Sequence, residues 1–241
     1  NAKDMRRARE LLGDYKGKLI AKIEKFDAVS NIDEIIETSD GIMVARGDLG
    51  IEVPYYDVPT IQKMLIRKSN AKGIPVITAT QMLLSMTQNE RATRAEISDV
   101  ANAVLDGTDI VMLSEESAVG ENPVNVVETM HNIIKQTEKI FDHEKRYKFT
   151  YLDEFDVIQA TVTKLADDLS ADGILSLTSS GNSARKMSRY RPITPLYTFA
   201  HDKETLTGLT ALWGVEPITT VKEAQASKMI QRMLRSLEKR E

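Results

Sequence analysis

Short apolar runs in the first half of the chain lead directly into charged or hydroxyl side chains. The first run ends in Lys22 and Glu24, the second in Asp48, and the third in Thr80 and Gln81. Lys22 and Glu24 stand two positions apart, so on a strand their side chains point to the same side. In parallel α/β folds the reactive side chains lie at the carboxyl ends of the strands, which makes these positions candidates for a site.

These residue types suit a metal-assisted reaction of an anionic substrate. The carboxylates of Glu24 and Asp48 are ligands for a hard divalent cation such as Mg²⁺ or Mn²⁺, which keeps water positions that a substrate replaces. Lys22 supplies a compact positive charge that stabilises a transferring phosphoryl group. Gly47 lets backbone amides approach an anion, and Thr80 offers the same anion a hydroxyl.

Four neighbouring residues at the strand ends are further candidates for the same site, namely Arg46, Gln81, Ser114 and Glu116. Taken singly, these motifs have ordinary explanations, because a Lys and a Glu two apart are usually a solvated pair and Arg-Gly-Asp is usually a turn. Their joint position on consecutive strand ends is what favours a functional site.

The elements that must position these side chains alternate between strand and helix. Apolar runs predict buried parallel strands at 18–23, 41–45, 75–79 and 110–113. Apolar stripes at helical spacing predict helices over 5–12, 58–65, 97–105 and 123–141. This order predicts βαβ units with right-handed crossovers.

The stretch 143–155 is charged and aromatic without periodicity, and we interpret it as a linker between domains at 1–142 and 156–241. The second domain repeats the alternation on a smaller scale. Its expected strands are 173–177, 195–200 and 215–218. Its expected helices are 157–169, one from 182, 203–213 and 221–237.

Composition excludes several classes of function. The hydrophobic fraction of 41% supports a packed core, and a net charge of −4 without charge blocks gives no sign of a nucleic-acid or membrane partner. The absence of Cys excludes disulfides and thiolate chemistry, and three scattered His residues argue against a His-based metal site. No apolar run approaches the roughly 18 residues that span a bilayer, so a cytoplasmic protein is expected.

Five ordered segments resemble the pyruvate kinase family: residues 21–25, 39–50, 75–83, 93–96 and 98–107. Long ordered strings of this kind are more specific than any short motif. The resemblance implies the second half of a TIM (β/α)8 barrel, strands five to eight, followed by a smaller three-layer α/β domain. It also implies a phosphotransferase of glycolysis that converts phosphoenolpyruvate and ADP into pyruvate and ATP.

The resemblance assigns roles to the strand-end residues. Lys22 corresponds to the lysine that stabilises the moving phosphoryl group, and Glu24 and Asp48 to the acids that hold Mg²⁺ or Mn²⁺. The backbone at Gly47 and Asp48 and the Thr80 hydroxyl correspond to groups that bind the substrate carboxylate. In the family these groups lie near the side of the substrate where the proton is transferred. The family further implies K⁺, with ligands outside this chain, and a cytoplasmic homotetramer.

A Ser-rich segment in the second domain resembles the family's effector loop, which binds a sugar-phosphate or nucleotide phosphate. Its hydroxyls and amides face the start of a helix, as in other anion sites. The residues are Thr178, Ser179, Ser180, Gly181, Asn182 and Ser183. The alternative is a Ser-rich helix cap that binds nothing.

The chain also departs from the family. Residues 113–118 read Leu-Ser-Glu-Glu-Ser-Ala, with Glu115 where the family usually has Gly, which puts the local backbone path in doubt. The family's first four barrel strands and lid domain have no counterpart in the sequence, so we expect no turnover from this polypeptide alone. We also expect the open edges of a half-barrel to cause self-association.

Two other functions remain open from the sequence. A metal-dependent lyase or aldolase barrel acting on oxoacids would also use a Glu and an Asp from neighbouring strand ends. A non-catalytic binding or interface module is the second alternative, since residues 93–96 resemble a family segment near the subunit contact.

Overall fold

The computed structural model describes residues 1–15, 17–143, 148–221 and 226–238. It divides into two compact units, Asn1–Asp142 and His143–Glu241, and each is considered by itself. Within the described residues, no helix combines the length and apolar character needed to cross a membrane.

Four parallel strands form the sheet of the first unit, in the order β1-β2-β3-β4. They are β1 (Ile20–Ile23), β2 (Gly41–Ala45), β3 (Val76–Ala79) and β4 (Ile110–Met112). The strands expected from the apolar runs are confirmed, with β2 at the expected bounds and the others one or two residues shorter. Because Ile23 pairs with Val44 and Ala45 with Ala79, the carboxyl ends of β1, β2 and β3 lie at one edge.

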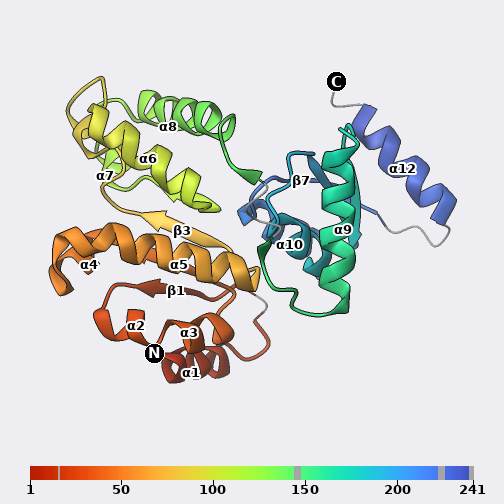
Figure 1. Cartoon of the computed structure of the whole chain (residues 1–241), viewed down its shortest axis with the longest axis horizontal. Helices are drawn as coiled ribbons and strands as arrows, with labels where there is room; N and C mark the ends of the chain where they lie inside the picture. The colour runs from red at the N-terminus through yellow and green to blue at the C-terminus, as the bar shows by residue number, and fades with distance from the viewer. Residues whose placement is uncertain (16, 144–147, 222–225, 239–241) are drawn as a thin grey trace. The chain divides into compact units, whose positions relative to one another are not determined.

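Helices follow these strands, as Figure 1 shows for α5, α6 and α8. The helices of at least ten residues are α1 (Ala2–Leu12), α5 (Val58–Lys72), α6 (Arg94–Asp106) and α8 (Pro123–Glu138). Shorter ones are α2 (Phe26–Ser30), α3 (Ile32–Thr38), α4 (Arg46–Glu52), η1 (Tyr55–Asp57), η2 (Leu84–Thr87) and α7 (Glu115–Ala118). The parallel α/β architecture of a partial barrel is therefore confirmed.

Local signals set where these helices begin and end. Asn1 and Thr93 each form a capping box with the acid three residues later, which satisfies amides at the starts of α1 and α6. Gly73 and Gly107 end α5 and α6 in the left-handed conformation that glycine adopts without strain. The helix that was expected to reach residue 141 ends at Glu138.

The core of the first unit consists of apolar side chains from the sheet and from the helices that cover it. One cluster joins β1, β2 and β3 to α3 and α5 and includes Ile23, Ile35, Val44, Leu65 and Val76. A second cluster lies beneath the segment after β3 and contains Met82, Leu83, Met86, Val100 and Val126 among others. The strand ends therefore project from a well-packed base.

The second unit has a parallel sheet of three strands in the order β5-β6-β7. They are β5 (Ile174–Thr178), β6 (Leu196–Ala200) and β7 (Val215–Thr220). The accompanying helices are α9 (Glu154–Asp168), α10 (Asn182–Ser188), α11 (Lys203–Gly208), η4 (Leu209–Ala211) and α12 (Ala226–Glu238). The expected alternation of a second α/β domain is confirmed.

Two expected boundaries in the second unit need correction. The helix α9 begins at Glu154, inside the expected linker 143–155, because the Asp153 side chain accepts a hydrogen bond from the Asp156 N–H and caps the helix. The last helix begins at Ala226 rather than at Val221, whose N–H donates to the Ala200 carbonyl. Residues 222–225 of that expected helix lie outside the described residues.

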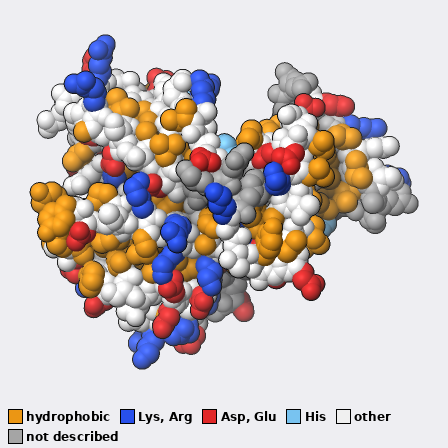
Figure 2. All heavy atoms as spheres, in the orientation of Figure 1, with side chains coloured by type: hydrophobic (Ala, Val, Ile, Leu, Met, Phe, Trp, Pro, Cys, Tyr) orange, Lys and Arg blue, Asp and Glu red, His pale blue; other side chains and the backbone are white. Residues whose placement is uncertain are grey.

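Figure 2 shows hydrophobic side chains gathered over α9 on the surface of the second unit. Four of them follow helical spacing and are exposed: Ile158, Val162, Leu165 and Leu169. In the first unit, β1 and β4 are the outer strands of the sheet. Both features favour association of the chain with other molecules.

We expect the purified chain to self-associate, because apolar side chains and the outer strands of the sheet are available to a second copy. Sedimentation velocity at several protein concentrations measures this directly. The weight-average sedimentation coefficient should rise with concentration. A single concentration-independent species of monomer mass would contradict the prediction.

Candidate active site

Lys22, Glu24 and Asp48 meet at the carboxyl edge of the first sheet. Lys22 and Glu24 lie at the end of β1, and Asp48 lies in the first turn of α4, which follows β2 directly. The Lys22 Nζ is 2.7 Å from the Glu24 Oε2 and 2.9 Å from the Asp48 Oδ2. Hydrogen bonds to Glu24 and then to Asp48 raise the pKa of Lys22 well above its ordinary value, so the side chain is an ammonium.

The two carboxylates fit a divalent cation. They converge on the same positive charge, although Glu24 and Asp48 are 24 positions apart in the sequence. Their side chains are 40% and 49% exposed, which leaves room for water or substrate beside them. In the described part of the chain, no group of three or more His, Cys, Asp or Glu side chains is arranged to hold a metal ion. Mg²⁺ is commonly held by one or two carboxylates, with water and phosphate completing its octahedron.

Neutralising either acid should weaken cation binding. In Glu24→Gln or Asp48→Asn, loss of one anionic ligand is expected to reduce the affinity for Mn²⁺ by about tenfold or more, which corresponds to about 1.4 kcal/mol. Glu37→Gln is the control, because Glu37 is an exposed acid on α3 that pairs with Lys72. Electron paramagnetic resonance of free Mn²⁺ measures the binding, and equal affinities in all three variants would contradict a cation site here.

A hydrogen bond joins Gly47, in the helix that follows β2, to Thr80, which directly follows β3. The Gly47 N–H donates to the Thr80 Oγ1 at 2.9 Å, so the hydroxyl keeps its own hydrogen for another acceptor. A Cβ on residue 47 would lie 3.4 Å from the Thr80 Oγ1, which is an ordinary contact distance. The Gly47 amide is already used by Thr80, so it does not donate to a second anion.

The backbone at Thr80 and Gln81 is strained in a way that the sequence does not reveal. The φ angles of the two residues are 71° and 54°, in the left-handed region that residues with a side chain seldom adopt. Such strain costs of order 1–3 kcal/mol per residue, persists only where the surroundings enforce it, and is common at functional sites. The turn delivers Met82 and Leu83 into the core, where both are fully buried.

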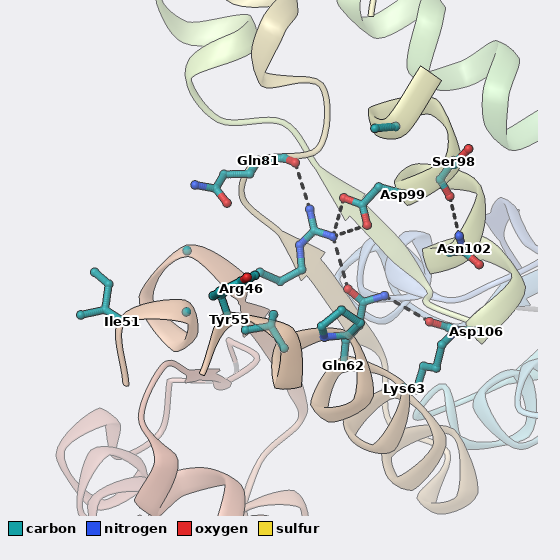
Figure 3. Close-up of a pocket in the computed structure, with 15 residues that line it drawn as sticks. Arg46, Ile51, Tyr55, Gln62, Lys63, Gln81, Ser98, Asp99, Asn102 and Asp106 are labelled. Carbon is teal, nitrogen blue, oxygen red and sulfur yellow. Dashed lines mark hydrogen bonds and ion pairs between the residues drawn. The ribbon is translucent and has the colours of Figure 1, made fainter. Parts of the chain in front are cut away.

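The four additional candidates have different surroundings. Arg46 is 9% exposed, and its guanidinium donates hydrogen bonds to Gln62, Gln81 and Asp99 (Figure 3). Glu116 is 1% exposed and accepts from the N–H groups of Leu83 and Ser114, so its carboxylate holds backbone in place and does not face the open edge. Gln81 has an exposed side chain, and Ser114 is partly buried.

Glu115, which stands where the family usually has glycine, is the first residue of α7 and is exposed. A right-handed helical conformation suits any residue with a side chain, so the helix itself does not require glycine there. Ser114, the residue before it, has φ −123° and ψ −103°, outside the regular helical and strand regions.

A cavity of about 720 Å³ lies beside the strand-end cluster, between α4, α5 and α6. Arg46, Gly47 and Gln81 line it together with residues such as Gln62 and Asp99 (Figure 3). Lys22, Glu24 and Asp48 are not among its lining residues. The cavity therefore lies next to the candidate catalytic and metal-binding residues but is not lined by them.

The Ser-rich loop of the second unit connects β5 to α10. The Thr178 Oγ1 accepts from the Gly181 N–H at 2.9 Å, and Gly181 takes a left-handed φ of 83° as the residue before α10. Ser179, Ser180 and Asn182 are exposed, and Ser183 is partly buried. Thr178 is 4% exposed, so its hydroxyl shapes the loop.

The first unit has parallel strands with a lysine between two acids at their carboxyl edge, and a smaller α/β unit follows it. These features define a partial α/β-barrel enzyme with an appended domain. The chain belongs to the pyruvate kinase family. The family model described as "Pyruvate kinase, barrel domain" matches residues 1–127, and "Pyruvate kinase, alpha/beta domain" matches residues 156–241. This assignment removes the lyase or aldolase alternative.

The relatives are consistent with the family models. A pyruvate kinase of Lactobacillus delbrueckii subsp. bulgaricus is 46% identical over 224 residues, covering 90% of this chain and 38% of the relative. A pyruvate kinase of Geobacillus stearothermophilus is 47% identical over 221 residues, covering 89% of this chain and 38% of the relative. One from Clostridium acetobutylicum is 44% identical over 234 residues, covering 94% and 50%. The chain thus spans between about two fifths and one half of the length of these relatives.

Proposed function

We propose that this chain supplies the phosphoryl-transfer edge of a pyruvate kinase, which moves a phosphoryl group from phosphoenolpyruvate to ADP and yields pyruvate and ATP. The observation that carries the proposal is the Lys22 ammonium held between the Glu24 and Asp48 carboxylates at the strand ends. The chain spans about two fifths of the length of these relatives, so the activity of the whole enzyme is part of the proposal.

The acidic and basic residues of the cluster have different proposed roles. Glu24 and Asp48 would hold Mg²⁺ or Mn²⁺, which neutralises negative charge on the phosphates when bound. Lys22 then directs its charge to the phosphoryl group as the bond from phosphorus to the enol oxygen breaks and the bond to an ADP oxygen forms. Preorganised charge at this point lowers the barrier because no reorganisation is needed during transfer.

The Thr80 hydroxyl is proposed to act on the carboxylate and enolate side of the substrate. Because it accepts from the Gly47 N–H, its own O–H is directed away from Gly47 and is available to an anion. After transfer, the enolate carbon takes up a proton to give pyruvate, and the proposed role of the hydroxyl is to orient the proton donor. K⁺ with ligands outside this chain, a cytoplasmic location and a homotetramer belong to the same proposal.

A hybrid enzyme tests the function. In it, this chain replaces the matching 224-residue segment of the Lactobacillus delbrueckii pyruvate kinase. With phosphoenolpyruvate, ADP and Mg²⁺, the hybrid should form pyruvate, which lactate dehydrogenase reports through NADH consumption. The unaltered relative is the positive control. A folded hybrid without activity would favour the non-catalytic alternative.

We also propose that the loop at 178–183 binds a phosphate-bearing effector. The Thr178–Gly181 hydrogen bond fixes the loop, and the exposed hydroxyls of Ser179 and Ser180 lie just before α10. Among the residues that the structure describes, the buried Arg185 Nε has no hydrogen-bond partner. Inorganic phosphate should shift the amide resonances of Ser179 and Ser180 in a saturable titration. Unchanged resonances at millimolar phosphate would favour a cap that binds nothing.

A further inference from the structure

The carbonyls of the strained turn at Thr80 and Gln81 accept hydrogen bonds from a buried arginine, Arg46. The Arg46 Nη2 donates to the Thr80 carbonyl at 2.7 Å and to the Gln81 carbonyl at 3.1 Å, and its Nε donates to the Thr80 carbonyl at 3.2 Å. Both carbonyls thus face one guanidinium, and Figure 3 shows its bond to Gln81. Because these two residues adopt left-handed φ angles, the arginine offsets backbone strain where it occurs.

Asp99 on α6 anchors the other side of the guanidinium. Its carboxylate oxygens accept from the Arg46 Nη1 at 2.8 and 2.7 Å, and the Gln62 Oε1 accepts from the same nitrogen at 3.3 Å. The Gln62 Nε2 donates in turn to the Asp106 carboxylate at 3.1 Å. Charge-assisted bonds of this kind fix a planar guanidinium more firmly than neutral ones.

Arg46 is also adjacent in sequence to two residues of the candidate site, Gly47 and Asp48. Gly47 donates its N–H to the Thr80 hydroxyl, and the Asp48 carboxylate contacts Lys22. The tripeptide 46–48 therefore makes three contacts. Its first two residues bind the carbonyl and the hydroxyl of Thr80, and its third, Asp48, pairs with Lys22. A shift of Arg46 would move these groups together.

We propose that Arg46, anchored by Asp99, is a positioning residue that holds the Thr80–Gln81 turn in its left-handed conformation and so sets the place of the Thr80 hydroxyl beside Gly47. Its catalytic consequence rests on the proposed pyruvate kinase function. The turn-holding role itself does not, because it concerns this chain alone.

Hydrogen exchange of the chain, measured amide by amide, tests the role without an activity assay. In Arg46→Lys a single ammonium cannot replace the planar fork that reaches two carbonyls and a carboxylate at once. We expect exchange at the Gly47 amide to accelerate about tenfold or more, which is about 1.4 kcal/mol. Amides within β2 and β3 should keep their wild-type rates. Asp99→Asn should give a smaller change of the same pattern, and Arg67→Lys, an exposed arginine on α5, should give none.

Chemical rescue separates positioning from simple loss of packing. In Arg46→Ala, millimolar guanidinium should refill the vacated site and slow the Gly47 exchange again, whereas equimolar NaCl should not. In the hybrid enzyme, Arg46→Lys should lower kcat by about 10²-fold with little change in the KM for ADP, since small displacements of a catalytic group have effects of that size.

Each outcome bears on the proposal. Unchanged Gly47 exchange in Arg46→Lys, or equal acceleration at every amide, would overturn it, and Asp99→Asn gives the same test if the arginine variants do not fold. An inactive hybrid with wild-type Arg46 would count against the proposed function only, because the exchange measurements would still decide whether Arg46 holds the turn.

Discussion

Replacing Lys22 with methionine in the hybrid enzyme is expected to reduce kcat by about 10³-fold. Methionine keeps the length and apolar stem of lysine but removes the charge that faces the transferring group, and deleting one preorganised donor typically has an effect of 10²–10³-fold. The KM for phosphoenolpyruvate should change far less, because the charge is needed most where the phosphoryl group is in transit. Steady-state kinetics with the coupled lactate dehydrogenase assay gives both constants.

Two further variants sharpen this prediction. Lys25→Met removes an exposed lysine three positions away and should leave kcat within a factor of about two, which excludes a general effect of net charge. Lys22→Met should also bind Mn²⁺ at least as tightly as the wild type, because the ammonium that competes for the two acids is gone. A Lys22→Met enzyme with wild-type kcat would remove Lys22 from the reaction.

The strand-end cluster illustrates what a sequence can predict. Lys22, Glu24 and Asp48 were identifiable because a parallel strand presents its reactive side chains where the apolar run stops, a purely local signal. The structure then brings the three side chains within hydrogen-bonding distance. Their roles in catalysis and metal binding stay predictions.

The contacts that hold the neighbouring Thr80–Gln81 turn could not be predicted, because they join distant segments of the chain. Arg46 and Asp99 are separated by 53 positions, and Arg46 and Thr80 by 34. Nothing in the types of these residues says that the arginine will be buried or that Thr80 will take a positive φ. Glu116 shows the converse: an acid at a strand end has the right type and place for a site, yet the fold buries it as an acceptor for backbone amides.

Short elements were missed for a related reason. The helices α2, α3 and α7 have five, seven and four residues, too few for an apolar stripe to repeat. The start of α9 was missed because its capping residue, Asp153, lies in a charged and aromatic stretch that has no periodicity. The long helices and the buried strands were predictable since burial imposes a period on their sequences.

The other large effect concerns stability. Arg189→Met is expected to lower the free energy of unfolding of the second unit by about 3–5 kcal/mol, the usual cost of leaving one buried charge without its partner. The Asp156 and Arg189 side chains are 0% and 1% exposed and form an ion pair. Trp213, the single tryptophan, lies in this unit and contacts Arg191, so its fluorescence during urea unfolding reports the change.

The size of this effect follows from how many groups the arginine satisfies. Besides Asp156, the guanidinium donates to the Thr150 carbonyl at 2.8 Å and to the Tyr190 hydroxyl at 3.1 Å. Burial also raises the pKa of Tyr190 well above its ordinary value, so that hydroxyl stays neutral. Without Arg189, the Asp156 carboxylate keeps the N–H of Leu152, at 2.8 Å, but loses its counter-charge.

Two controls separate an unpaired charge from lost packing. Arg189→Met combined with Asp156→Leu should recover much of the lost stability, because no charge then remains in the apolar interior. Lys164→Met, which breaks an exposed pair with Asp168 one helical turn away, should change stability by only about 0.5 kcal/mol or less. If the double variant were as unstable as Arg189→Met alone, the guanidinium would act mainly by filling space and by bonding to Thr150, and the ion pair would contribute little.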